Sequence, residues 1–237
     1  MDAIERILEN PEKIKFAFQP VVSASTGEIF GYEALMRADP FSPLEVIDYC
    51  IKTKQLVRLE EITMLYSIKA FLRNNLEKKI FINSLPGACM SEAFSDIWLN
   101  EVGRKIAGRI VLEMVEYTEL DIRSWIRKLE EFQRGNAGTG NVSHIAIDDV
   151  GLDRESDPAR IKLYHPTMIK IDRSLIKNIS SDTDKQKRVD GIIAQMKERN
   201  ILILAEGIET KAEYDYFSNL PIDYMQGFYI QKPKIYD

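Results

Sequence analysis

Two patterns of apolar positions alternate along this chain. Short apolar runs predict strands at residues 16–22, 29–37, 80–82, 110–112, 145–147, 168–171, 201–205 and 224–229. Apolar residues at helical spacing predict helices over 2–9, 44–55, 57–75, 121–134, 185–199 and 210–220. From residue 80 onward strands and helices alternate, which predicts a parallel sheet covered by helices.

The first two predicted strands are joined differently from the rest. Only the short turn at 23–28 separates them, which predicts an antiparallel hairpin. Together with the six later strands they make eight, which fits a closed (β/α)8 barrel of about 250 residues. An open doubly wound sheet is the alternative, but no GxGxxG motif follows the first strand. We therefore expect an α/β fold with one barrel domain over 1–237, in which 1–14 is an N-terminal helical segment and 15–233 is the barrel.

Composition narrows the class of protein. Of the 237 residues, 45% are hydrophobic and 29% are charged, which argues against disorder. Lysine and arginine number 32 against 37 acidic residues, so no nucleic acid polymer is expected as a partner. No apolar run approaches the length of a membrane span and no signal-peptide pattern begins the chain, so a cytoplasmic protein is expected. The two cysteines, Cys50 and Cys89, form no disulfide framework.

Polar side chains stand at or just after the ends of the predicted strands. They are Glu33, Asn83, Glu113, Asp148, Asp149, Lys170, Glu206 and Gln226. The carboxyl ends of the strands meet at one end of a barrel, so we expect these side chains to be neighbours. Crowded carboxylates need cations, and oxygen ligands suit hard ions such as Mg²⁺ or Mn²⁺. With one lysine beside them, they indicate metal-assisted phosphoryl chemistry on an anionic substrate, with two ions about 3.5–4 Å apart.

Each of these residues alone also has an ordinary structural interpretation. An acid directly after an apolar run is often a helix N-cap, and Lys170 could be a solvated surface residue. The series carries the functional interpretation, because unrelated surface acids would not fall at the same phase of successive strands. The glycine-rich stretch at 135–141 follows a predicted helix and precedes a strand, so we interpret it as a plain connection.

Several sequence blocks carry these residues. They are Phe18-Gln19-Pro20-Val21-Val22, Thr26-Gly27-Glu28, Tyr32-Glu33-Ala34-Leu35-Met36-Arg37, Ile82-Asn83, Leu112-Glu113-Met114-Val115-Glu116, Ile147-Asp148-Asp149-Val150-Gly151, Ile169-Lys170-Ile171-Asp172-Arg173-Ser174, Ala205-Glu206-Gly207-Ile208-Glu209-Thr210 and Gln226-Gly227-Phe228. In order and spacing the chain resembles the EAL domain family of bacterial cyclic-di-GMP phosphodiesterases over roughly residues 16–233. The resemblance implies a modified (β/α)8 TIM-like barrel whose first strand is antiparallel to the others, in agreement with the hairpin. It also implies hydrolysis of cyclic-di-GMP to linear pGpG.

The resemblance further implies a role for each site residue. Glu33, Asn83, Glu113 and Asp148 would hold one Mg²⁺ or Mn²⁺ ion, and Asp148 would bridge to a second ion on the side of Asp149 and Glu206. The implied catalytic residues are Lys170, Glu206, Asp149 and Gln226, of which Lys170 and Gln226 position the attacking water or the scissile phosphate. The implied contacts to the dinucleotide are Gln19, Glu33, Leu35, Arg37 and Gln226. Glu116 and Glu209 would support the site from behind the ligands, and Glu116 would hold the loop at 150–158.

The sequence departs from the family pattern after Asp149. The family continues Phe-Gly-Thr-Gly-Tyr-Ser-Ser, whereas this chain has a charged stretch at 150–158. In the family this loop lies beside the metal site and contributes to coupling within a homodimer. Met114 and Val115 also replace the usual Ile-Thr pair. An active phosphodiesterase is the leading hypothesis, because the ligand set is complete. A catalytically weak receptor that binds cyclic-di-GMP and signals to a partner is the alternative, and an unrelated metal-dependent barrel enzyme would leave the ordered blocks unexplained.

Overall fold

The computed structural model describes residues 3–97, 104–106, 108–115, 122–136, 144–151 and 157–236. The chain forms two compact units. Unit 1 comprises residues 1–18, 34–143 and 235–237, and unit 2 comprises residues 19–33 and 144–234. Strands β1 (Lys15–Ser23) and β2 (Ile29–Arg37) each contribute residues to both units.

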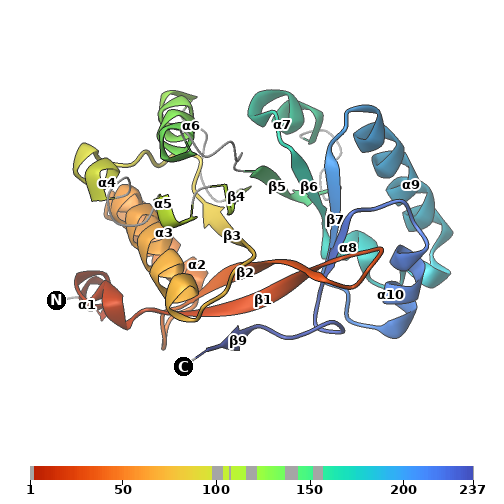
Figure 1. Cartoon of the computed structure of the whole chain (residues 1–237), viewed down its shortest axis with the longest axis horizontal. Helices are drawn as coiled ribbons and strands as arrows, with labels where there is room; N and C mark the ends of the chain where they lie inside the picture. Colours follow the sequence, from red (N-terminus) through yellow and green to blue (C-terminus); the bar gives the residue numbers. More distant parts are fainter. Residues whose placement is uncertain are drawn as a thin grey trace. The chain divides into compact units, whose positions relative to one another are not determined.

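Unit 1 contains helices on a short parallel sheet. Its elements are α1 (Ala3–Glu9), the 3-10 turn Pro11–Lys13, α2 (Pro43–Lys52), α3 (Leu56–Arg73), β3 (Lys79–Ser84), α4 (Glu92–Ile97), α5 (Arg104–Ile106), β4 (Ile110–Met114) and α6 (Ile122–Asn136). Helix α3 packs on β3, and α2 packs on α3 (Figure 1). Strands β3 and β4 are parallel, with Asn83 opposite Glu113 at their carboxyl ends.

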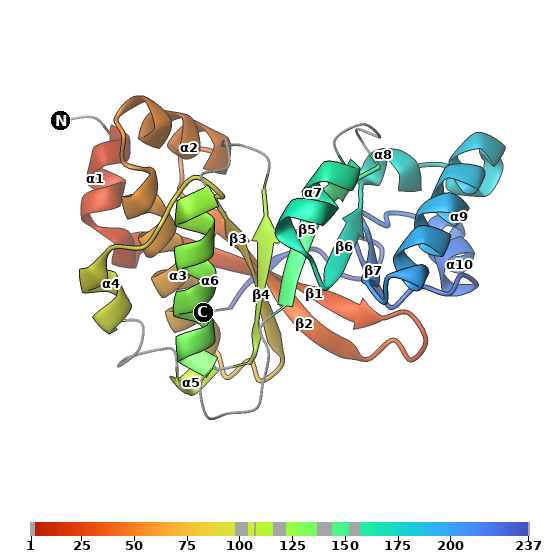
Figure 2. The same cartoon turned by 90° about the horizontal axis from the view of Figure 1, so that it is seen from above.

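Unit 2 contains the longer run of alternating strands and helices. Its elements are β5 (His144–Val150), α7 (Asp157–Tyr164), β6 (Met168–Ile171), α8 (Arg173–Ile176), the 3-10 turn Ile179–Ser181, α9 (Thr183–Glu198), β7 (Leu202–Glu206), α10 (Lys211–Ser218) and β8 (Tyr224–Gln226). Strands β5, β6, β7 and β8 are parallel neighbours in that order, and β5, β6 and β7 lie side by side in Figure 2. Strand β1 pairs with β8 in the antiparallel direction, with Val22 opposite Met225. The short strand β9 (Lys234–Ile235) follows.

Local sequence explains where these elements begin and how they pack. Strands covered on both faces need apolar side chains in succession, and Ile169, Ile203 and Leu204 are fully buried. Helix α2 begins at a capping box. The Ser42 hydroxyl accepts a hydrogen bond from the Glu45 backbone N–H, and the Glu45 carboxylate accepts one from the Ser42 backbone N–H. Among the described residues, no helix combines the length and apolar composition needed to cross a membrane.

The structure confirms the alternating pattern and the antiparallel first strand, and differs in detail. The last predicted strand ends at Gln226 rather than at 229, because the chain turns at Gly227. A Cβ atom at Gly227 would lie 2.0 Å from the Ile208 carbonyl oxygen, so only glycine fits this approach. Helices α4, α5, α7 and α8 were not predicted. Helices α4, α5 and α8 have six, three and four residues, which is too few to show a helical period. The prediction of a single domain stays a prediction.

Candidate functional site

Four strands bring three carboxylates to one lysine within unit 2. The ammonium of Lys170 on β6 lies 2.9 Å from Glu206 Oε2 on β7, 3.2 Å from Asp148 Oδ1 on β5 and 4.0 Å from Glu33 Oε1 on β2. The Lys170 side chain is fully buried, and that of Glu33 is 7% exposed. The structure therefore brings Glu33, Asp148 and Glu206 together around Lys170.

A chain of amide contacts extends this cluster to β8 and β1. The Gln226 side-chain amide donates to Glu33 Oε2 at 2.6 Å and to Gln19 Oε1 at 3.3 Å. Gln19 in turn donates to the Gln231 carbonyl at 3.0 Å. Gln19 and Gln226 are both buried, and among the described residues no group donates a hydrogen bond to Gln226 Oε1. That oxygen is thus a buried acceptor beside the carboxylates.

The Asp148-Asp149 pair owes its position to an irregularity in the sheet. The register between β5 and β6 shifts between Ile147 and Val150, so both aspartates lie in the irregular part. Asp149 has a φ of +56°, and its backbone N–H donates to Asp148 Oδ1 at 3.2 Å. The Arg160 guanidinium on α7 donates a hydrogen bond to the Asp148 backbone carbonyl at 2.8 Å. Positive φ at a residue other than glycine is a strained conformation that is typical of functional sites.

The electrostatics of the cluster show an excess of negative charge. Burial raises the pKa of Glu206 to about 8, and although Lys170 opposes this shift, the charges of Asp148 and Glu33 add to it. Burial also acts to raise the pKa of Asp148, but the charge of Lys170 and hydrogen bonds from Glu206, Lys170 and the Asp149 N–H hold it below its usual range. One ammonium cannot keep three neighbouring carboxylates ionised.

The chemistry of these donors fits a hard divalent cation. The cluster presents only carboxylate and amide oxygens, which are the ligands that Mg²⁺ and Mn²⁺ prefer. A divalent charge would also oppose the burial and the repulsion that together raise the pKa of Glu206. In the part of the chain that the structure describes, no three His, Cys, Asp or Glu side chains already form a metal-binding group. The carboxylates instead point to the Lys170 ammonium.

Apart from Glu209 in unit 2, the other predicted site residues belong to unit 1 or lie outside the described residues. Asn83 and Glu113 are adjacent at the ends of β3 and β4, and Glu113 is fully buried. Leu35 and Arg37 lie on β2, where the Arg37 guanidinium donates to the Met36 carbonyl at 2.9 Å. Glu116 and residues 152–156 of the loop at 150–158 lie outside the described residues.

A buried charge network in unit 1 was not predicted. It fixes the chain directly after Asn83: the Lys128 ammonium on α6 contacts Glu60 Oε1 on α3 at 2.6 Å and Ser84 Oγ at 2.9 Å. Glu60 also accepts from the Leu85 N–H at 3.0 Å. Both charged side chains are essentially fully buried.

A second unpredicted group lies in unit 2, where Arg173 and Glu213 fix the turn that follows Glu206. Glu209, which was predicted to support the site, belongs to this group. Thr210-x-x-Glu213 has the sequence of a capping box, which indicates a role for Glu213 at the start of a helix. Arg173 belongs to the sequence block at 169–174 that resembles the family, but the resemblance assigned it no role.

The strand directions and the polar cluster define the class of protein, an α/β protein of the TIM-like barrel type with an oxygen-rich cluster of side chains. Comparison with protein families identifies it further: the EAL domain matches residues 1–233, and the chain belongs to the EAL domain family. The family and the fold inferred from the sequence are thereby confirmed.

Known relatives and solved structures agree with this assignment. The chain is 29% identical, over 99% of its length and 47% of the relative's, to a probable cyclic di-GMP phosphodiesterase, PdeG of Escherichia coli K12, and thus spans about half of that protein. A standalone versatile EAL protein from Vibrio cholerae O395, solved in its c-di-GMP bound form, is 25% identical with a TM-score of 0.73, covering 94% of this chain and 93% of that chain. Klebsiella pneumoniae BlrP1, solved as a manganese/cy-diGMP complex, is 22% identical with a TM-score of 0.77, covering 94% of this chain and 56% of that chain. The fold is a modified TIM-like (β/α)8 barrel, and strand β1 of this chain is antiparallel to β8.

Proposed function

We propose that this chain is a metal-dependent phosphodiesterase that opens one phosphodiester bond of cyclic-di-GMP and releases linear pGpG. The observation that carries this proposal is the meeting of Glu33, Asp148 and Glu206 around Lys170 at the strand ends. Membership of the EAL family and the activity named for the Escherichia coli relative support the same substrate.

The proposed metal ligands are the oxygen donors at the strand ends. They are Glu33, Asn83, Glu113, Asp148, Asp149 and Glu206, and they would hold two Mg²⁺ or Mn²⁺ ions. Such ions, when bound, supply a lowered pKa for water and offset charge on the phosphoryl oxygens. Hard oxygen donors and the raised pKa of Glu206 support this proposal, as does the manganese in the complex of the Klebsiella protein.

The remaining residues orient the reactants. Lys170 supplies a buried positive charge, which would attract a phosphate oxygen and fix the direction of the Asp148 and Glu206 carboxylates. Gln226 donates to Glu33 and leaves Oε1 to accept from a water molecule. Gln19, Leu35 and Arg37 would contact the dinucleotide, and Glu209 and Glu116 would support the site from outside the ligand set.

The proposal is tested by incubating the purified chain with cyclic-di-GMP and Mg²⁺ or Mn²⁺ and separating the nucleotides by chromatography. We expect pGpG to accumulate and its formation to stop when a chelator is added. Binding of intact cyclic-di-GMP without turnover would instead support the receptor, and neither binding nor turnover would refute both functions. Light scattering of the same sample would test whether this chain forms a homodimer, as its resemblance to the family implies.

Two variants distinguish a loss of activity at the site from a loss of folding. Glu33→Ala removes the carboxylate that Gln226 holds, so turnover should fall by at least about a hundredfold. Glu28→Ala is the matched control, because it removes an exposed acid in the same hairpin. Circular dichroism should show the same folded state for both variants. Near-native turnover of Glu33→Ala would contradict the proposed role of this residue.

A further inference from the structure

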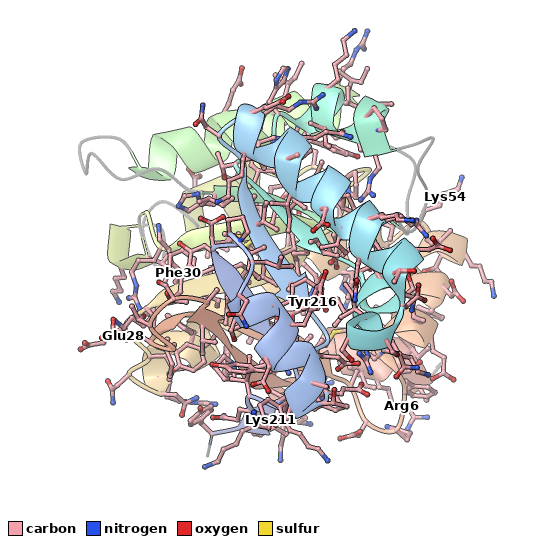
Figure 3. All side chains as sticks on the ribbon, turned by 90° about the vertical axis from the view of Figure 1, so that its right-hand side faces the viewer. Arg6, Glu28, Phe30, Lys54, Lys211 and Tyr216 are labelled. Atoms are coloured by element: carbon pink, nitrogen blue, oxygen red, sulfur yellow. The ribbon has the colours of Figure 1, made fainter. Side chains whose placement is uncertain are left out.

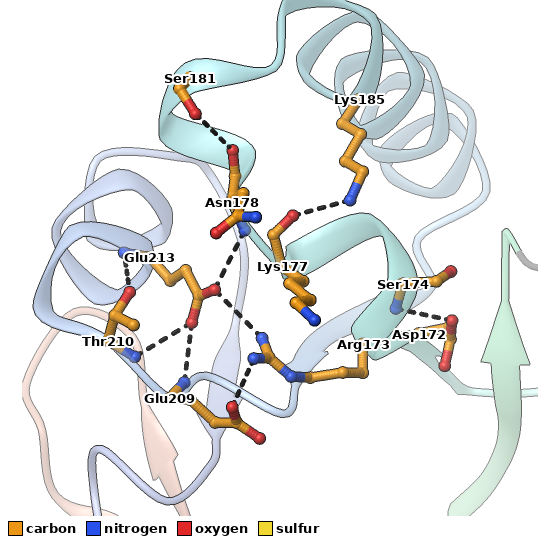
Figure 4. A network of polar contacts seen from close by, with 10 residues as sticks. All are labelled: Asp172, Arg173, Ser174, Lys177, Asn178, Ser181, Lys185, Glu209, Thr210 and Glu213. Atoms are coloured by element: carbon orange, nitrogen blue, oxygen red, sulfur yellow. Dashed lines mark hydrogen bonds and ion pairs between the residues drawn. The ribbon is translucent and has the colours of Figure 1, made fainter.

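The turn that follows Glu206 is held by a network of charged groups from two helices (Figure 4). The turn spans residues 207–210 between β7 and α10. At its centre lies the Glu213 carboxylate, which is 2% exposed. Its Oε2 accepts from the Glu209 N–H at 2.8 Å and from the Thr210 N–H at 3.0 Å, so a single carboxylate oxygen fixes the backbone of the turn.

Arg173 connects this turn to the chain that follows Lys170. It is the first residue of α8, which Asp172 caps by accepting from the Ser174 N–H at 2.8 Å. The Arg173 guanidinium donates to Glu213 Oε1 at 3.1 Å and to Glu209 Oε2 at 2.6 Å. One planar guanidinium therefore binds the Glu209 carboxylate of the turn and the Glu213 carboxylate of α10 through two different nitrogens.

The hydrocarbon part of Arg173 also sets the path of the backbone. Gly207 directly follows Glu206 and has a φ of +82°. A Cβ atom there would lie 2.4 Å from Arg173 Cδ, so the arginine stem packs on the Gly207 backbone. On the other side of the turn, the Ile208 N–H donates to the Gln226 carbonyl at 3.0 Å. The turn is thus held between β6 and β8, the strands that carry Lys170 and Gln226.

We propose that Arg173 is a positioning residue, which acts through Gly207 and Glu209 to hold the Glu206 carboxylate toward Lys170 and Asp148. This inference rests on the proposed function, because it assigns Arg173 to the site that would bind the metal. Side chains behind metal ligands typically alter metal affinity or activity 10- to 100-fold, about the range that this role requires.

The test uses Arg173→Ala and Arg173→Lys in the full chain and measures Mn²⁺ affinity by calorimetry, with kcat and KM for cyclic-di-GMP. Arg173→Ala should weaken Mn²⁺ binding about tenfold or more and lower kcat with a small change in KM. Arg173→Lys keeps the charge and most of the stem but reaches fewer acceptors, so it should recover part of both losses. If Arg173→Ala does not fold, the comparison of Arg173→Lys with the unmodified chain carries the test.

Lys211→Ala is the matched control. Lys211 begins α10 and pairs with Asp215, its side chain is 71% exposed, and it faces outward from the helix (Figure 3). This variant should leave Mn²⁺ affinity and kcat unchanged. Folded Arg173 variants with lowered thermal stability but native Mn²⁺ affinity and kcat would overturn the positioning role. If the unmodified chain itself neither binds Mn²⁺ nor hydrolyses cyclic-di-GMP, the proposed function fails first.

Discussion

Lys128→Met should strongly destabilise the protein, because it leaves a buried carboxylate without its counter-charge. The Lys128 ammonium contacts Glu60 Oε1 at 2.6 Å, Ser84 Oγ at 2.9 Å and the Leu85 carbonyl at 2.9 Å. Methionine is unbranched like lysine and only one heavy atom shorter, so the change removes the charge and these contacts without opening a large cavity. Glu60 would keep the donors Ser84 Oγ and the Leu85 N–H.

The magnitude follows from the burial of the pair. The side chains of Lys128 and Glu60 are 0% and 1% exposed, so water cannot replace the missing partner. Removing one member of such a pair costs about 3–5 kcal/mol in the free energy of unfolding. For a chain of this size that corresponds to a fall in the melting temperature of roughly 6–20 °C.

The assay is urea unfolding followed by circular dichroism, with Glu60→Gln and the double variant as companions. Because Glu60→Gln/Lys128→Met removes both charges, it should be less destabilised than the sum of the single variants by about 1–3 kcal/mol. Arg127→Met is the matched control, because the neighbouring Arg127 side chain is 45% exposed and pairs with an exposed acid. A loss below about 1 kcal/mol for Lys128→Met, or additive single variants, would refute the reasoning.

Three further predictions concern a glycine, the N-terminal helix and the site. Gly207→Ala should lower the free energy of unfolding by about 2 kcal/mol more than Gly27→Ala does, as measured by urea unfolding. Both glycines have a positive φ, but only a methyl group at Gly207 would collide with Arg173. Equal losses in the two variants would contradict this. Glu5 accepts hydrogen bonds from Gln55, Arg58 and Tyr49, which lower its pKa from 4.5 to about 2. The stability that Glu5 contributes is therefore present above pH 4.5 and is lost as the pH falls toward 2. Hydrogen exchange of α1 should accelerate between these pH values, and a Glu5→Gln variant should not show the change. In the metal-free protein the pKa of Glu206 is about 8, so Mn²⁺ must displace a proton below that pH. Calorimetry should show the affinity for Mn²⁺ rising about tenfold per pH unit between about pH 6 and 8. An affinity that does not change with pH would contradict this.

The sequence predicts the strands and their polar ends well, because both depend on local pattern. Apolar runs locate β6 and β7, and the first polar residues in or after them, Lys170 and Glu206, do meet in the structure. The irregular register at Asp148-Asp149 was not predictable, because it depends on how β5 pairs with β6 rather than on its own composition.

The ion pairs between residues far apart in the chain could not be predicted from the sequence. Glu60 lies in helical register with Met64 and Phe71, so its place on the buried face of α3 could be read from the period of 3.6 residues. Its partner Lys128 lies 68 residues further along the chain. Arg173 and Glu213 are 40 residues apart, and only tertiary packing brings them together. Local pattern identifies which residues are buried but not which of them pair.

In each unit, the chain next to a candidate ligand is fixed by charged groups that are not ligands themselves. Within unit 1 the Glu60–Lys128 pair binds Ser84 and Leu85, directly after Asn83. Within unit 2 Arg160 binds the backbone of Asp148, and Arg173 with Glu213 binds the turn after Glu206.

There is a physical reason why the charged groups bind the neighbouring backbone and not the ligand carboxylates. A carboxylate fully satisfied by arginine or backbone N–H groups would hold a metal ion weakly, because the ion would have to displace those donors. Fixing the backbone beside the ligand restricts where its carboxylate can point and leaves its oxygens available. A family member could therefore keep every ligand and still lose metal affinity through a change at Arg173, which no inspection of the ligand set would reveal.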